Sequence, residues 1–184
     1  MKFTETSLVD AFVVDIEAIE DERGFFARGW CRREFEARGL PAVTAQANIS
    51  FSKQRGTLRG LHWQEPPHAE NKLVRCMRGG IFDVAVDLRP GSPTYLKWFG
   101  VELTDKNHRM LLVPEGFAHG FQTLEDRTEV FYMVSEFYAP KFEQGARYDD
   151  PAFGIEWPLD VTEISDKDSS WPRFEKSRND DPHR

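Results

Sequence analysis

The feature of this chain that most constrains its fold is a long series of short strand-like segments separated by turn residues. Apolar and polar residues alternate over lengths typical of single strands, and Gly, Pro, Asn and Asp gather between them. Because each such strand must bury one face against another sheet, the pattern predicts an all-β sandwich or barrel. The expected strands cover residues 12–16, 25–26, 73–77, 81–88, 95–103, 110–113, 121–124 and 128–137.

Two of these strands form the clearest local prediction. Segments 73–77 and 81–88 are joined by Arg78-Gly79-Gly80, which predicts a β-hairpin. In its second strand the alternation places Asp83 and Asp87 together on one side, so we expect a half-polar face.

Helical pattern is sparse in this chain. Residues 31–39 are the best helix candidate, and Gly39 and Pro41 would end that helix. The segment from Trp157 is rich in Asp, Ser and Pro and is expected to be irregular. It ends in a polar tail over about residues 176–184.

The composition indicates a folded, acidic protein. Aromatic residues make up 13% of the 184 residues, which is too many for a disordered chain. The length suits a single domain over residues 1–184, and we find no repeat or linker. The formal net charge is −7 and no Lys/Arg run exceeds two residues, so nucleic acid is not an expected partner.

Cysteine usage and hydropathy bear on the compartment. Cys31 and Cys76 do not form a C-x-x-C pair, so the sequence supports neither a disulfide framework nor a structural zinc site. The first residues lack the apolar stretch of a signal peptide, and no apolar run approaches the ~20 residues of a spanning helix. We therefore expect a soluble, cytoplasmic protein that does not contact membranes.

Residues 58–64, Leu-Arg-Gly-Leu-His-Trp-Gln, carry the strongest chemical signal. Arg59 and His62 point to opposite faces of a regular strand, but a bend or bulge at Gly60 would bring them to one face. A histidine in a pocket moves protons near neutral pH, and an arginine beside it binds phosphate. The pair predicts proton chemistry on an anionic substrate. The competing interpretation is a hydrogen-bonded His and a surface Arg.

Three further residues could complete such a site. Lys72 at a strand start suits an enolate oxygen, although most lysines are solvated. Tyr132 lies on an otherwise apolar strand, where a tyrosine is usually a core residue unless His62 faces it. Asp168 could orient His62 and strengthen it as a base, or it could belong to a simple polar turn.

The histidine pattern argues against a metal site. Pro114-Glu115-Gly116-Phe117-Ala118-His119 fits the Pro-x-Gly-x-x-His spacing seen in cupin jelly rolls. Metal-binding cupins add a His-x-His pair and a carboxylate, whereas the residues two positions either side of His62 are Gly60 and Gln64. These are too few ligands for a tight divalent site. A metal-dependent cupin using His62, His68 and His119 is therefore the disfavoured alternative.

In this order and spacing, the motifs resemble those of the dTDP-4-dehydrorhamnose 3,5-epimerases, the RmlC-type cupins. The resemblance runs from about residue 8 to residue 172. The matching segments are 21–26, 58–64, 72–76, 82–87, 92–94, 114–121, 131–132, 138–140, 154–158 and 165–168.

The resemblance implies an all-β cupin jelly roll (a double-stranded β-helix) with one or two short helices. It implies a homodimer that needs no metal or other cofactor. The implied activity is that of an isomerase in deoxysugar or rhamnose biosynthesis, acting on a dTDP-linked 4-keto-6-deoxyhexose. Both inverted carbons, C3 and C5, adjoin the C4 ketone, so their protons are acidic once the enolate is stabilised.

The resemblance also implies residue roles. His62 would be the base with Asp168 as its partner, Tyr132 would deliver a proton from the opposite face, and Lys72 would stabilise the enolate oxygen. Tyr138 would stack on the thymine. The positions that match substrate-binding residues are Arg23, Arg28, Gln46, Asn48, Arg59, His119, Tyr138, Glu143 and Lys167.

The chain departs from the family pattern at three positions in the nucleotide-recognition region. Arg28 replaces the usual Glu, Ala47 interrupts the usual Gln-Asp-Asn, and Ile49 replaces the common His. A donor cannot replace an acceptor against a thymine N–H, so another base such as cytosine is a possible alternative. Two further alternatives are a 3-epimerase acting on one carbon and a non-catalytic sugar-binding cupin.

Overall fold

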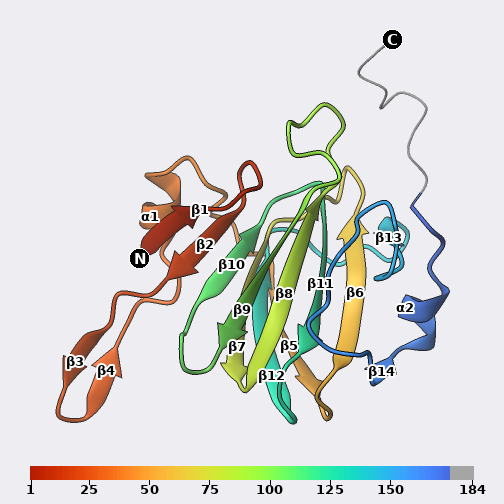
Figure 1. Ribbon diagram of the computed structural model, residues 1–184. Helices are drawn as coiled ribbons and strands as arrows, with labels where there is room; N and C mark the ends of the chain where they lie inside the picture. The colour runs from red at the N-terminus through yellow and green to blue at the C-terminus, as the bar shows by residue number, and fades with distance from the viewer. Residues whose placement is uncertain (175–184) are drawn as a thin grey trace.

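The computed structural model describes residues 1–174, and these form two packed β-sheets with two short helices (Figure 1). The all-β jelly-roll prediction is confirmed. One sheet contains, in spatial order, β1 (Lys2–Glu5), β2 (Phe12–Asp15), β10 (Met110–Val113), β7 (Lys72–Arg78), β12 (Thr128–Val134) and β5 (Gln46–Ser52). The other contains β13 (Glu143–Gly145), β6 (Thr57–Gln64), β11 (Phe117–Thr123), β8 (Gly80–Asp87) and β9 (Trp98–Thr104), with β14 (Glu163–Ile164) parallel to β6.

The remaining elements lie at the two ends of the chain. The hairpin of β3 (Ile19–Asp21) and β4 (Gly24–Phe26) projects from the body of the molecule (Figure 1). Helix α1 (Arg32–Glu36) follows it, and helix α2 (Asp166–Ser170) lies on the other side of the molecule, near β6 and β14. No helix within residues 1–174 is long and apolar enough to cross a membrane.

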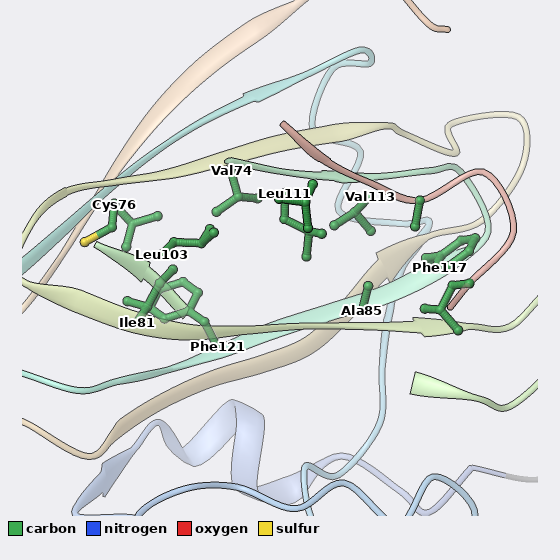
Figure 2. Close-up of a cluster of buried hydrophobic side chains, with 13 residues drawn as sticks. Val74, Cys76, Ile81, Ala85, Leu103, Leu111, Val113, Phe117 and Phe121 are labelled. Atoms are coloured by element: carbon green, nitrogen blue, oxygen red, sulfur yellow. The ribbon is translucent and has the colours of Figure 1, made fainter. Parts of the chain in front are cut away.

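The main core lies between the two sheets (Figure 2). Alternate residues of each strand point inward, so Val74 and Leu111 of the first sheet meet Ile81, Ala85 and Phe121 of the second. Two smaller clusters cover the outer faces. One packs α1 against β7 and β10, and the other packs residues 146–157 and Phe174 against β6, β8 and β11.

This layering explains the polar side chains of β8. Asp83 and Asp87 are both fully buried, so the predicted half-polar face does not meet solvent. Asp87 accepts hydrogen bonds from Arg89, Ser92 and Thr94, which satisfy a carboxylate that would otherwise be costly to bury.

The predicted hairpin over residues 73–88 is wrong. β7 pairs with β10 and β12 in one sheet, whereas β8 pairs with β9 and β11 in the other. Gly79 has φ +75°, and a Cβ there would lie 2.7 Å from the Thr128 hydroxyl. The two glycines therefore turn the chain from one sheet into the other rather than folding it back beside itself.

Other element boundaries differ modestly from the predictions. The helix expected over 31–39 is limited to Arg32–Glu36, and the strand expected from Tyr95 begins at Trp98, after a turn in which Leu96 has φ 60°. The segment after Trp157, expected to be irregular, contains β14 and α2. The predicted polar tail, about residues 176–184, lies outside the described residues.

Candidate active site

Two adjoining cavities are lined by residues of β5, β6, β7 and β12. The larger cavity has a volume of about 450 Å³ and the smaller about 270 Å³. Both are lined by His62, Lys72 and Tyr132, so the three principal candidates from the sequence face the same space.

A break in strand pairing brings Arg59 and His62 together, as predicted. β6 and β11 pair with a register shift, so His62 lies opposite His119 and Arg59 opposite Phe121. Gly60 lies within this irregularity at φ +124°, and a Cβ there would lie 2.6 Å from the Gly120 Cα. Only glycine suits such a backbone at so close an approach. Arg59 and His62 consequently both line the smaller cavity.

His62 is paired with a carboxylate from the C-terminal segment. Its Nε2 lies 2.7 Å from Asp168 Oδ1, and the Gly60 amide donates to Asp168 Oδ2 at 3.1 Å. Ser165 caps α2 by accepting from the Asp168 amide, which holds that carboxylate in place. Burial disfavours the ionised carboxylate, yet the hydrogen bonds and charge of His62 and the Gly60 amide outweigh burial and lower the pKa of Asp168.

This pairing assigns the tautomer of His62. An ionised carboxylate only accepts, so Nε2 carries the proton that it donates to Asp168. Nδ1 is then the nitrogen with a free lone pair, and Asp168 stabilises the imidazolium that forms when Nδ1 takes up a proton.

Tyr132 and Lys72 face this base from the opposite sheet. Burial raises the pKa of Tyr132, and the nearby negative charge of Glu70 adds to the effect. The hydroxyl therefore stays protonated and able to donate. Lys72 is only 12% exposed, and its Nζ lies 3.1 Å from Glu70 Oε1, so it is not a solvated surface lysine.

A second group of predicted residues is connected by hydrogen bonds at the larger cavity. Gln46 Oε1 accepts from the Tyr138 amide at 2.7 Å. Glu143 accepts from the Tyr138 hydroxyl at 2.7 Å and from Lys167 Nζ at 2.6 Å. Burial opposes ionisation of Glu143, but these two donors lower its pKa. Asn48, the remaining predicted residue here, also lines this cavity.

Arg59 and His119 line the smaller cavity. The Arg59 guanidinium donates to the Ser52 hydroxyl and the Phe51 carbonyl, which fixes its plane. His119 Nε2 lies 2.8 Å from Asp83 Oδ1, and Asp83 is fully buried. His62 on β6 and His119 on the neighbouring strand β11 are thus each paired with one aspartate.

The structure does not place Arg23 or Arg28 at these cavities. Arg23 lies on the β3–β4 hairpin, 89% exposed and paired with Asp21. Arg28 is exposed, with its guanidinium 3.7 Å from Glu34. Ala47 and Ile49 are exposed and alternate along β5 with the cavity-lining Gln46 and Asn48, so they point away from the cavities.

Sequence reasoning missed Glu70 and Asp83 as members of the site. Glu70 precedes Lys72 by two residues, and the period of a strand could have placed both on one side. Asp83 carried a weaker signal, a charge on a strand with buried neighbours. His68 packs against Phe142 and does not line either cavity. Within residues 1–174 no group of three or more His, Cys, Asp or Glu side chains could hold a metal ion.

Comparisons with known proteins identify the family of this chain. The family described as dTDP-4-dehydrorhamnose 3,5-epimerase matches residues 5–176. A dTDP-4-dehydrorhamnose 3,5-epimerase from Methanothermobacter thermautotrophicus is 47% identical over 174 residues, covering 92% of each chain. The crystal structure of the enzyme from Elizabethkingia anophelis has a TM-score of 0.92 at 39% identity, covering 95% of this chain and 96% of that one. The Bacillus anthracis enzyme, with TDP and PPi bound, has a TM-score of 0.91 at 42% identity, covering 94% and 99%. The chain belongs to the dTDP-4-dehydrorhamnose 3,5-epimerase family.

Proposed function

We propose that this protein inverts C3 and C5 of a dTDP-linked 4-keto-6-deoxyhexose. The observation that carries this proposal is that the His62–Asp168 pair and the half-buried Tyr132 line one cavity, with His62 on one sheet and Tyr132 on the other. Inversion at carbon requires a base on one face of the sugar ring and an acid on the other.

The proposed chemistry is a pair of proton transfers at each carbon. Nδ1 of His62 removes the proton next to the C4 ketone, and the electrons of the broken C–H bond move onto the ketone oxygen as an enolate. Lys72 stabilises that oxygen by its charge. When the enolate collapses, Tyr132 donates its hydroxyl proton to the opposite face of the carbon. His62 and Tyr132 return to their starting states by proton exchange with water.

The binding group would orient the substrate. Arg59 and Lys167 are cations suited to the diphosphate, and the exposed ring of Tyr138 would stack on the base. Binding energy from these remote contacts would hold the sugar against His62 and Tyr132. Because Ala47 and Ile49 point away from the cavities, the alternative of a cytidine nucleotide rests on Arg28 alone, and we favour dTDP.

The assembly we infer is a homodimer. Ile19 and Phe26 pair across the β3–β4 hairpin and are 70% and 68% exposed, which is unfavourable for an isolated chain. Packing of this hairpin on a second copy would bury both side chains and could bring Arg23 to the other copy's nucleotide. Light scattering tests this inference: Phe26→Asp should shift the mass toward a monomer, whereas Val9→Asp, a control at another exposed apolar residue, should not.

Product configuration tests the proposed reaction. After incubation of dTDP-4-keto-6-deoxyglucose with the protein, inversion at both C3 and C5 is the expected result. Inversion at C3 alone would assign a 3-epimerase, and an unchanged sugar that nevertheless binds would favour the sugar-binding alternative.

The cytoplasmic location of the protein stays a prediction.

A further inference from the structure

A third paired carboxylate, that of Glu70, lies at the cavities and has no role among those assigned above. Glu70 lies in the connection between β6 and β7, and its side chain is only 12% exposed. It lines the larger cavity together with His62, Lys72 and Tyr132. A largely buried carboxylate beside the binding site of an anionic substrate is unfavourable unless a nearby cation compensates its charge.

The carboxylates of Asp168, at the smaller cavity, and Glu143, at the larger one, are each engaged by two donors. Asp168 is bound by His62 and by the Gly60 amide, and Glu143 is bound by both Lys167 and Tyr138. Within residues 1–174, Glu70 forms an ion pair only with Lys72, at 3.1 Å. Glu70 therefore differs from the others in acting on the residue that would meet the enolate oxygen.

We propose that Glu70 is a positioning residue, which anchors the Lys72 ammonium toward the ketone oxygen and places a negative charge in the cavity that the Tyr132 hydroxyl lines. This inference rests on the roles of Lys72 and Tyr132 in the proposed function. The long lysine stem has many rotamers, and the largely buried ion pair of Lys72 with Glu70 reduces that freedom before substrate arrives.

The charge of Glu70 also acts on Tyr132, whose surroundings contain charges of both signs. The negative charge of Glu70 disfavours the tyrosinate, and the positive charge of Arg59 favours it, after the larger effect of burial. Removing the negative charge of Glu70 leaves the positive charge of Arg59, which favours the tyrosinate. The pKa of Tyr132 should therefore fall. The ionisable side chains that line the two cavities with Tyr132 are Arg59 and His62 on β6, Lys72 on β7, His119 on β11, Glu143 on β13, Asp168 on α2, Glu70 and Tyr138.

Glu70→Gln tests the proposal, because it removes the charge and keeps the shape. Glu65→Gln is the matched control, since Glu65 lies exposed in the same β6–β7 connection. Unchanged circular dichroism and thermal midpoints would show that both variants are folded.

The first readout needs no activity. With ¹³Cζ-labelled tyrosine, the Tyr132 resonance is assigned by its loss in Tyr132→Phe and followed by NMR as the pH is raised. The midpoint should fall by about half a pH unit to one unit in Glu70→Gln, as expected for one charge across a partly solvated cavity. It should stay unchanged in Glu65→Gln. An unchanged Tyr132 midpoint in Glu70→Gln would overturn the electrostatic role.

The second readout tests action through Lys72. Glu70→Gln should lower kcat about tenfold with a smaller change in KM, and this loss should largely disappear in a Lys72→Ala background. A change in KM alone, or a loss that is fully additive with Lys72→Ala, would overturn the positioning role. If the wild-type protein inverts no substrate, the proposed function fails instead, and the Tyr132 titration still decides whether Glu70 acts on that hydroxyl.

Discussion

His62 and Asp168 are 106 residues apart in the sequence, yet their side chains meet at 2.7 Å between Nε2 and Oδ1. The contact depends on the C-terminal segment, which returns along β6 as β14 and continues into the Ser165-capped helix α2. The base of the proposed reaction is thus completed by residues that a truncation before Glu163 would remove.

We predict that Asp168→Asn lowers kcat roughly 10²-fold or more, because the amide cannot stabilise the imidazolium as a carboxylate does. Asp166→Asn is the control, since Asp166 lies exposed on the same helix turn. Steady-state kinetics measures both variants. Equal activity of Asp168→Asn and wild type would remove Asp168 from the mechanism.

The same carboxylate should make stability depend on pH. The pKa of Asp168 is lowered in the folded protein, so its contribution to folding is fully present above the unfolded value near pH 4. That contribution is lost as the pH falls through the lower folded pKa. Denaturant titrations from pH 7 to pH 3 should therefore show a smaller acid-induced loss of unfolding free energy in Asp168→Asn than in Asp166→Asn. An equal loss in the two variants would contradict the assignment.

Tyr132→Phe should separate the two proton transfers. The base remains, so proton removal continues, whereas inversion should fall about 10²-fold or more for lack of the acid. Comparing the rate of solvent deuterium incorporation with the rate of product formation measures the separation. Tyr148→Phe, outside both cavities, should leave both rates unchanged. Full inversion by Tyr132→Phe would show that another group supplies the proton.

Lys72→Ala should lower kcat about tenfold or more, as loss of an oxyanion-stabilising group does. The loss should appear at both C3 and C5, because both enolates place charge on the same ketone oxygen. Lys106→Ala, at an exposed turn, is the control. A selective loss at one carbon would mean that Lys72 orients the sugar instead.

Gly60→Ala should destabilise the protein by about 2 kcal/mol or more, because the new Cβ would overlap β11. Gly24→Ala is a sharp control: Gly24 has φ +125°, nearly that of Gly60, but nothing lies within 4 Å of its Cβ position. Thermal unfolding of the two variants separates backbone strain from the clash between strands. Equal losses would place the whole effect in the backbone angle.

Much of the fold could be predicted from local pattern. Strand alternation and turn residues predicted the sheets, and the glycine in Arg59-Gly60-Leu61-His62 predicted the irregularity that brings Arg59 and His62 to one cavity. The 73–88 hairpin could not be excluded in the same way, because Gly79 and Gly80 suit both a tight turn and a crossing between sheets.

The site was less accessible to local reasoning. Resemblance to the family identified Asp168 and Tyr132, but from the residues alone each was also compatible with a polar turn or a core position. Their approach to His62 is set by strand order and by the return of the C-terminal segment, which are long-range features. Arg23 and Arg28 lie away from the cavities of their own chain, so their binding roles stay predictions that depend on the inferred dimer.

Proton NMR of dTDP-4-keto-6-deoxyglucose in deuterium oxide tests the central claim most directly, with wild-type protein compared with His62→Ala. The account predicts loss of the C3 and C5 proton signals with wild type. It predicts retention of both signals with folded His62→Ala. Exchange at both carbons by His62→Ala would show that another base does the chemistry, and no exchange by the folded wild-type protein would contradict the epimerase assignment itself.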